Sequence, residues 1–358
     1  MGQYYWWPNS QGKGVKMGNG IGFDAGTYNL VCCKRNAEGN FVYKREVNAF
    51  LEMELENEFV FNMMQKSGVP LILREDANIA YALGEAAIKM AYTMRNIDLK
   101  RPMKDGCVNA AEKNSFQIMN IMIHSLLDDV TQDKEVLYYS IPANAINEKT
   151  DADYHRKILD AIFKAFKSDK GWSVDARPIN EGMALVYAEL GEKMFTGIGV
   201  SCGAGMVNVA FSLYGTEVFS FSIVNSGDWI DAQAAHACNE SIAFINKEKT
   251  KIDLNKEPVT LVERAIKAQY ELMIEKTVTG IKKGLIENKD NIRIDHPIDI
   301  IVAGGTSSPP GFDKMFESLV KLAAMPIEIG SVVRPVDPLF SVARGCLIAA
   351  ENAGPALK

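Results

Sequence analysis

The order of apolar and polar residues predicts short strands and amphipathic helices that follow one another along the chain. Two apolar runs separated by small residues, over 21–33, predict two strands joined by a tight turn. The rest of the first half is predicted to hold a strand at 136–141 and helices through 86–90, 116–127, 151–166 and 181–190. Alternating strands and helices are typical of α/β proteins.

The second half repeats the opening pattern. Its predicted elements are strands at 195–201, 207–213 and 217–224, helices from 229 to about 244 and over 261–287, and a buried strand at 298–302. A glycine-bearing turn separates the first two of these strands, as it does in the first half. A strand–turn–strand unit early in each half indicates an internal duplication.

The composition is that of a globular protein with room for two domains. The chain has 358 residues, of which 47% are hydrophobic and 23% are charged. A net charge of −6 argues against direct nucleic-acid binding, because phosphate affinity depends on clustered Lys and Arg. No apolar run approaches the roughly 20 residues of a membrane-spanning helix, and no signal-peptide pattern is present. We therefore predict a cytoplasmic protein.

The cysteines change this picture little. Six are scattered, mostly within apolar stretches and without a C-x-x-C spacing, and the chain has only four histidines. This distribution argues against a zinc site. We expect buried, reduced thiols, which fit the reducing cytoplasm.

Residues 1–20 show no periodic pattern, hold five glycines and one proline, and are predicted to form a flexible tail. Four aromatic residues, Tyr4, Tyr5, Trp6 and Trp7, stand in this segment. They fit either a segment that packs against the body of the protein or an anchor for a membrane interface, a subunit or an adaptor. A myristoylation signal is not predicted, because Trp6 stands where Ser or Thr is required.

Three glycine-bearing turns carry the candidate chemistry. They are Gly22-Phe23-Asp24-Ala25-Gly26-Thr27, Gly203-Ala204-Gly205 and Ala303-Gly304-Gly305-Thr306. Nucleotide phosphates need backbone N–H donors at close range, and small residues let the main chain approach them. The chain has neither the G-x-x-x-x-G-K-S/T motif of phosphate-loop NTPases nor the G-x-G-x-x-G of a Rossmann domain. A single pair of glycines is common in hairpin turns and indicates no function by itself. The order of the three turns along the chain is therefore the feature that indicates nucleotide binding.

That order resembles the actin, MreB and DnaK-type chaperone superfamily, which also includes sugar kinases. Segments 22–27, 200–208 and 303–311 resemble its first phosphate motif, its second phosphate motif and its adenosine motif. Three further segments, 101–106, 226–231 and 337–345, favour the MreB-type actins of bacteria or archaea. The resemblance extends from about residue 21 to about residue 350.

The resemblance implies two duplicated actin-like (ribonuclease H-like) α/β domains with a nucleotide cleft between them. The implied divisions are a tail at 1–20, domain I at 21–180 with a small subdomain inserted at about 45–100, domain II at 181–335 and a C-terminal helix at 336–358 that returns to domain I. Between Asp228 and Gly304 the pattern leaves little room beyond two helices, with a short connection at 246–259. We therefore expect a reduced outer subdomain in the second half.

The resemblance also implies ATP and Mg²⁺ as ligands. Asp24 would hold hydrated Mg²⁺, and Glu181 would position the water that attacks the terminal phosphate. From the residues alone, Asp24 also fits a turn cap and Glu181 a first-turn acid that stabilises a helix dipole. The implied nucleotide-binding residues are Gly26, Thr27, Tyr28, Asn29, Gly203, Ala204, Gly205, Met206, Gly227, Asp228, Glu263, Lys267, Gly304, Gly305 and Thr306. A solvated helix face explains Glu263 and Lys267 equally well.

The second phosphate motif departs from the family pattern at two positions. The family has an Asp where this chain has Ser201, and a Thr where it has Met206. Phosphoryl transfer depends on positioning and on charge neutralisation through Mg²⁺, so the loss of a carboxylate beside the metal predicts slow hydrolysis. Gly203 and Gly205 are retained, and nucleotide binding is therefore still expected.

Three functions remain open from the sequence. The leading hypothesis is a cytoskeletal actin-like ATPase that polymerises with itself into filaments. The alternatives are a non-polymerising ATP-switch adaptor of the FtsA or PilM type and, with less support, a small-molecule kinase. No convincing sugar-binding set of Asn, Asp and Glu accompanies the turns. The chain ends at Lys358, which leaves no room for the peptide-binding domain of a DnaK-type chaperone.

Overall fold

A computed structural model gives the fold of the chain. It describes residues 20–54, 62, 66, 71–74, 79–93, 99–127 and 129–353. The aromatic residues Tyr4, Tyr5, Trp6 and Trp7 lie outside the described residues, so the expectations for them stay predictions. Below, residues 20–180 are called the first half and residues 181–335 the second half.

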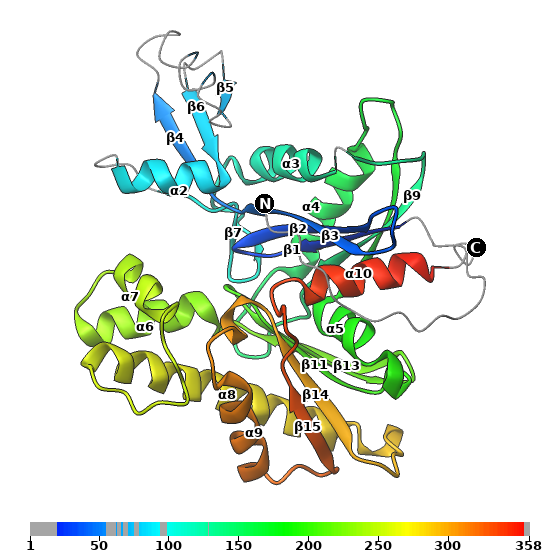
Figure 1. Cartoon of the computed structure of the whole chain (residues 1–358), viewed down its shortest axis with the longest axis vertical. Coiled ribbons are helices and arrows are strands. Elements are labelled where there is room, and N and C mark those ends of the chain that lie inside the picture. Colours follow the sequence, from blue (N-terminus) through cyan, green and yellow to red (C-terminus); the bar gives the residue numbers. More distant parts are fainter. Residues whose placement is uncertain are drawn as a thin grey trace.

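Each half is built around a five-stranded mixed sheet (Figure 1). The first sheet has the order β10-β9-β1-β2-β3 and consists of β1 (Gly20–Ala25), β2 (Asn29–Arg35), β3 (Phe41–Val47), β9 (Glu135–Ile141) and β10 (Val174–Asn180). The second has the order β13-β12-β11-β14-β15 and consists of β11 (Gly197–Cys202), β12 (Val207–Leu213), β13 (Thr216–Ile223), β14 (Ile298–Ala303) and β15 (Ile329–Val333).

The two sheets have the same topology. In the first, β1 pairs antiparallel with β2 and parallel with β9, and β10 adds parallel to β9. In the second, β11 pairs antiparallel with β12 and parallel with β14, and β15 adds parallel to β14. The third strand of each half, β3 or β13, extends the antiparallel side. This equivalence confirms the predicted duplication and the predicted α/β fold class.

Smaller elements are inserted in the first half. Strands β4 (Phe50–Glu54), β5 (Leu71–Arg74) and β6 (Ile79–Leu83) form a three-stranded sheet next to helix α2 (Gly84–Thr93). Strands β7 (Met103–Lys104) and β8 (Cys107–Val108) form a short hairpin whose tip is Asp105-Gly106. The three-stranded sheet and α2 lie within 45–100, the range of the predicted small subdomain, and the hairpin lies just beyond it.

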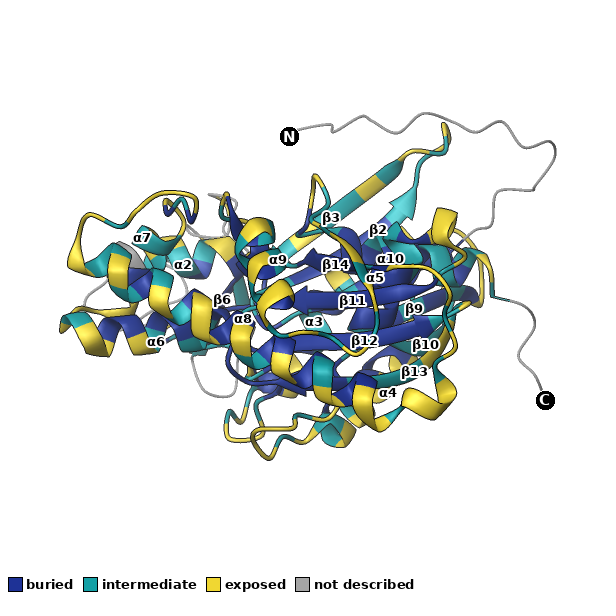
Figure 2. Cartoon of the chain, turned by 90° about the horizontal axis from the view of Figure 1, so that it is seen from below, coloured by how far each residue is buried: buried dark blue, intermediate teal, exposed yellow. Residues whose placement is uncertain are grey.

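Helices pack around the two sheets (Figure 1). The remaining described α-helices are α3 (Ser115–Leu126), α4 (Ala152–Ala165), α5 (Glu181–Glu189), α6 (Gly227–Cys238), α7 (Ile242–Lys249), α8 (Leu261–Glu287), α9 (Phe312–Leu322) and α10 (Ser341–Glu351). Short 3₁₀ turns lie at η2 (Gly191–Lys193), η3 (Lys289–Asn291) and η4 (Gly305–Ser307). Figure 2 shows that strands β11, β12 and β14 are mostly buried, whereas α4 and α8 have exposed outer faces.

Helices α5 and α10 each cross from one sheet to the other. Helix α5 follows β10 of the first sheet but packs on β11 and β12 of the second, and α10 follows β15 but packs on β1 and β9. The two helices also pack on each other, and a Cβ atom at Gly345 would overlap the carbonyl oxygen of Ala184. Because only glycine allows this approach, the crossing of α5 and α10 holds the halves together at backbone contact.

A second link between the halves lies beyond β9. The segment after this strand adds to the edge of β13, since Ser222 N donates to Asn144 O at 3.0 Å and Ile146 N donates to Ser222 O at 2.9 Å. The side chain of Asn147 extends the contact by accepting from Val224 N at 3.1 Å. The edge strand of the second sheet is thereby covered by the first half.

The outer part of the second half is helical, and its helix boundaries differ from those predicted. The helix predicted from 229 to about 244 ends at Cys238, because Asn239 adopts a left-handed conformation with φ 52°. Ser241 then caps α7 by accepting from Phe244 N at 3.2 Å. The predicted short connection therefore begins after α7. Residues 224–297 hold helices and no strand, which fits a reduced outer subdomain.

Several strands of the first half were not predicted, β10 among them. The segment Val174–Asn180 carries no predicted element but forms β10, and all seven of its residues are half-buried. Such a segment has no alternation of apolar and polar positions to reveal it. Pro178 is tolerated because β10 is an edge strand. The strand β3 was likewise missing from the prediction.

The thiols largely follow the prediction. All six cysteines are free, and five of them are buried. The exception is Cys238, which is half-buried at the end of α6. Burial raises the pKa of the Cys32 thiol to about 12, so this thiol stays protonated at neutral pH.

Candidate functional site

The first glycine turn joins β1 to β2 and places Asp24 at the cleft. The Ser140 hydroxyl, at the end of β9, accepts from Ala25 N at 3.0 Å and donates to Asp24 Oδ1 at 2.8 Å. Burial raises the pKa of Asp24 to about 6, against the lowering effect of the Ser140 hydrogen bond. The carboxylate is therefore held in a fixed direction and still ionised at neutral pH.

Asn48 braces the same turn from outside the glycine motif. Its Nδ2 donates to Gly26 O at 3.1 Å, and its backbone N donates to Tyr28 O at 2.8 Å. With these carbonyls engaged, the turn keeps one shape. Within the part of the chain that the structure describes, no group accepts from the N–H of Thr27 or Tyr28. Such N–H groups are suitable donors to phosphate.

Glu181 is the first residue of α5 and comes from the other side of the cleft. The cap of this helix is Asn180, whose side chain accepts from Gly182 N at 2.8 Å. The Ser201 hydroxyl donates to Glu181 Oε2 at 2.9 Å. Burial and then the negative charge of Asp24 raise the pKa of Glu181 to about 8, while hydrogen bonds from Ser201 and Asn208 lower it. Asp24 and Glu181 therefore face each other closely enough to repel.

This pair of acids fits one hydrated Mg²⁺ beside phosphate. The described residues contain no cluster of three or more His, Cys, Asp or Glu side chains that would bind a metal without help. Mg²⁺ commonly uses one or two carboxylates, its own waters and the substrate phosphates. The buried Asn29 Oδ1 at the first turn has no partner among the described residues, and a metal-bound water is a donor that suits it. The residues present therefore fit such an ion, and the role of Asp24 stays a prediction.

The second turn, between β11 and β12, is held by the start of α6 and by the third turn. The carbonyl oxygen of Gly203 accepts from Ser226 Oγ at 2.6 Å, from Thr306 Oγ1 at 2.7 Å and from Gly227 N at 3.2 Å. The Asp228 N–H donates to Ala204 O at 2.8 Å. In this structure the first N–H groups of α6 support the turn, and the direct nucleotide contacts of Gly227 and Asp228 stay predictions.

The third turn follows β14 and packs under the second. Gly304 has φ 93°, and a Cβ atom there would overlap the carbonyl oxygen of Cys202. Its N–H donates to Pro338 O at 2.8 Å, which ties the turn to the segment before α10. Gly305 begins η4 and is exposed, and the nearest neighbour of a Cβ atom there would be Leu339, at 3.8 Å. The structure therefore brings the second and third turns together as predicted for phosphate and adenosine motifs.

The turns of the two halves also meet. A Cβ atom at Gly205 would overlap the backbone N of Gly106 and would lie 2.6 Å from Thr27 Oγ1. Met206 is 2% exposed and packs in an apolar cluster with Cys107 and Val224, so its side chain joins the halves. The predicted contribution of Met206 to nucleotide binding therefore falls to its backbone.

Two predicted residues lie in other interactions. Glu263 is the third residue of α8 and completes a capping box: its carboxylate accepts from Val259 N at 2.7 Å and Thr260 N at 3.0 Å, which lowers its pKa. Lys267 Nζ donates to Lys256 O at 3.1 Å. Among the described residues, no hydrogen bond or ion pair joins either side chain to the three turns. Their contact with the ribose stays a prediction.

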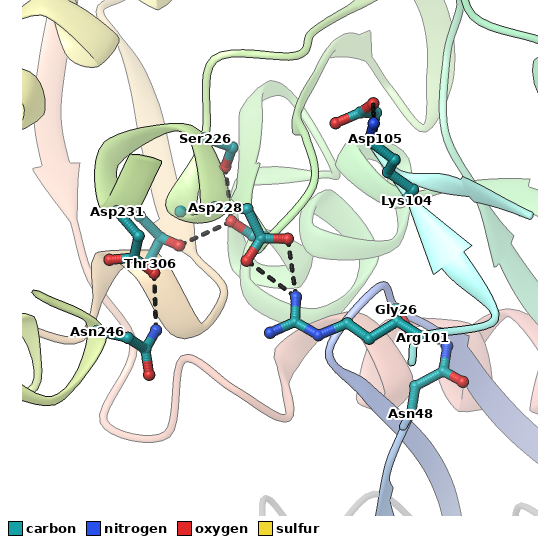
Figure 3. A network of polar contacts seen from close by, with 12 residues as sticks. Gly26, Asn48, Arg101, Lys104, Asp105, Ser226, Asp228, Asp231, Asn246 and Thr306 are labelled. Atoms are coloured by element: carbon teal, nitrogen blue, oxygen red, sulfur yellow. Dashed lines mark hydrogen bonds and ion pairs between the residues drawn. The ribbon is translucent and has the colours of Figure 1, made fainter. Parts of the chain in front are cut away.

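Arg101 is a polar residue of the site that sequence reasoning placed in a motif without a role. Its Nη1 lies 2.9 Å from both carboxylate oxygens of Asp228 (Figure 3). Its Cζ lies 4.8 Å from the centroid of the Tyr28 ring. Ser140, Asn48 and Asn208 were missed as well. Polar residues inside strongly apolar strands, as at Ser140 and Asn208, were the available signal.

The comparisons with known proteins agree with this architecture. The family model described as Volactin matches residues 19–350. No curated protein matches the chain. No described helix is long and apolar enough to cross a membrane.

Solved structures share the fold at low sequence identity. The structure described as a MamK double helical filament has 15% identity and a TM-score of 0.67, over 93% of this chain and 99% of that chain. MreB5 of Spiroplasma citri bound to ADP has 16% identity and a TM-score of 0.60, over 92% and 95%. A non-polymerising MamK mutant bound to AMPPNP has 16% identity and a TM-score of 0.57, over 94% and 100%. These similarities confirm the predicted actin-like fold.

Proposed function

The chain belongs to the Volactin family, and from its actin-like fold and its cleft we propose that it binds ATP with Mg²⁺ and assembles with itself into cytoplasmic filaments. The observation that carries the proposal is the convergence of the glycine turns on the acids Asp24 and Glu181 at the junction of the two halves. The nucleotides in the similar structures, ADP and AMPPNP, and the filament of MamK support it.

In the proposed complex, each turn has a distinct task. The N–H groups of Thr27 and Tyr28 would bind phosphate from the first half, and those of Ala204 and Gly205 from the second. Gly304 and its neighbours would pass beneath the adenosine. Asp24 would hold Mg²⁺ through its waters, and the bound ion would supply charge neutralisation of the phosphates.

Hydrolysis is proposed to be slow. The hydrogen bond from Ser201 fixes the direction of Glu181, so the acid can orient a water. With a pKa of about 8, however, Glu181 is mostly protonated at neutral pH and is a weak acceptor for the proton of that water. Ser201 supplies no charge where the family has a carboxylate. Turnover should therefore be slow even where binding is tight.

Isothermal titration calorimetry with Mg²⁺ and ATP tests the binding step. We expect the wild-type protein to bind ATP, and Asp24→Asn to lose roughly tenfold in affinity when Mg²⁺ is present, since one charge-assisted interaction is removed. Asp290→Asn, in the exposed turn after α8, is the matched control and should bind as the wild type does. Absence of ATP binding by the wild-type protein would refute the proposal.

Sedimentation with and without ATP tests the assembly step. Binding without assembly under any nucleotide would favour the adaptor function. Phosphate transfer to an added sugar would favour a kinase. Assembly that requires ATP is the result expected of a filament-forming actin-like protein.

A further inference from the structure

An ion pair crosses the cleft between the two halves. Arg101 lies just before β7 in the first half, and Asp228 is the second residue of α6 in the second half. Arg101 Nη1 donates to Asp228 Oδ1 and to Oδ2, each at 2.9 Å (Figure 3). Of the ion pairs among the residues that the structure describes, this one alone joins 20–180 to 181–335.

Each partner of this pair also contacts one of the two phosphate turns. The guanidinium of Arg101 lies over the ring of Tyr28, in the first turn, with a distance of 4.8 Å from Cζ to the ring centroid. The backbone N–H of Asp228 donates to Ala204 O, in the second turn, at 2.8 Å. The two turns are therefore connected through one continuous chain of contacts, from Tyr28 through Arg101 and Asp228 to Ala204.

The pair is accessible enough to open. The side chains of Arg101 and Asp228 are 28% and 37% exposed, so water competes for both charges. A partly exposed pair of this kind stabilises only weakly, so thermal motion breaks it readily. The α5–α10 crossing, by contrast, is made by backbone contacts inside the protein. The halves are thus joined by lasting contacts at the helices, along the edge of β13 and in the apolar cluster of Met206, whereas the pair of Arg101 and Asp228 is a contact that can open and close.

We propose that Arg101 is a positioning residue for the nucleotide: by pairing with Asp228 it holds the two phosphate turns at binding distance, and the nucleotide leaves when the pair separates. This inference rests on the proposed function, because it assigns a task at the same nucleotide site. Arginine suits the task better than lysine, because its planar guanidinium can stack on the Tyr28 ring and donate hydrogen bonds to the Asp228 carboxylate at the same time.

The release rate of a fluorescent ATP analogue, chased with excess ATP in a stopped-flow instrument, tests the proposal. Arg101→Gln and Asp228→Asn should each speed release by about threefold to tenfold. The double variant should release no faster than either single variant, because the same pair is lost in each. Raising the salt concentration should speed release from the wild type and leave the double variant unchanged.

The controls separate this role from a loss of stability. Arg177→Gln removes a pair within β10 whose side chains, at 22% and 44% exposed, match those of Arg101 and Asp228, and it should leave release unchanged. Arg101→Lys retains the charge and should give an intermediate rate. Thermal unfolding of each variant shows whether it is folded, and small-angle X-ray scattering without nucleotide should give a larger radius of gyration for Arg101→Gln.

The outcomes are distinct. If Asp228→Asn slows release or leaves it unchanged, Arg101 acts by binding phosphate itself and the proposed pairing role is wrong. If the double variant shows the sum of two independent effects, the pair is not the unit that controls release, and the proposal is equally wrong. If the wild type binds no nucleotide at all, the proposed function fails, and the scattering experiment alone decides whether the pair holds the cleft.

Discussion

The substitution Glu181→Gln tests the electrostatics of the cleft. The pKa of Glu181 is raised from 4.5 to about 8, chiefly by burial. Between these two values the folded protein keeps a proton that the unfolded chain releases, so wild-type stability is fully present below the lower value and falls as pH rises toward the higher one. Because the glutamine side chain does not ionise, the stability of the variant should not show this decrease as pH rises.

The magnitude follows from the width of the pH window. Each pKa unit corresponds to about 1.4 kcal/mol, and the part of the window from 4.5 to about 8 that lies between about pH 6 and about pH 8 gives at most about 2.7 kcal/mol. The side chain of Glu181 is half-buried beside the cleft, and partial contact with water reduces the expected value to about 1–2 kcal/mol. Relative to the wild type, Glu181→Gln should therefore gain this amount of stability between the two pH values.

Urea unfolding of the nucleotide-free protein in EDTA, at several pH values across this window, measures the effect. Glu263→Gln is the control: the pKa of Glu263 is lowered by its capping bonds, so the acid stays ionised throughout and the variant should differ from the wild type by a constant amount. A constant difference for Glu181→Gln as well would refute the reasoning, because it would mean that Glu181 ionises as an ordinary carboxyl group does.

Three further substitutions test other parts of the site. Ser201→Asp adds a carboxylate beside Glu181, so it should lower the thermal unfolding midpoint of the ligand-free protein. Mg²⁺ and ATP should raise the midpoint of this variant by more than that of the wild type, and the variant should release phosphate faster. An unchanged response of the midpoint to Mg²⁺ would contradict this expectation. Gly205→Ala should weaken ATP binding, measured by calorimetry, by about tenfold, because its Cβ atom would lie 2.6 Å from Thr27 Oγ1 and overlap Gly106. Gly191→Ala is the control: the nearest neighbour of its Cβ atom would be 3.7 Å away, so this variant should bind ATP as the wild type does. The side chain of Asp231 is 2% exposed and lies 2.8 Å from Lys249 Nζ, so Lys249→Met leaves a buried carboxylate without its charged partner. The free energy of unfolding, measured in urea, should fall by about 3 kcal/mol, and adding Asp231→Leu to the same chain should largely restore it.

The turns were predictable because their chemistry is local. A glycine between two apolar runs specifies a hairpin, and Gly26 and Gly203 stand in the turns where the prediction placed them. The helix starts at Asp151 and Asn180 were likewise predictable, since each side chain caps the helix that follows it. The duplication also followed from the order of these elements.

The residues that complete the site were less predictable, because their roles depend on tertiary contacts. Ser140 becomes a neighbour of Asp24 only when β9 pairs with β1, and Asn208 contacts Glu181 only when α5 packs on β12. Arg101 finds Asp228 across 127 positions of sequence, and nothing local specifies that pairing. The end of α6 at Asn239 depends on a single left-handed residue inside a continuous helical pattern.

The most direct test of the central claim is electron microscopy of the pelleted protein with Mg²⁺ and ATP, beside a sample without nucleotide. The account predicts filaments that form with ATP and are lost in Asp24→Asn, the variant that removes the carboxylate assigned to Mg²⁺. A protein that binds ATP yet stays unassembled in both samples would contradict it.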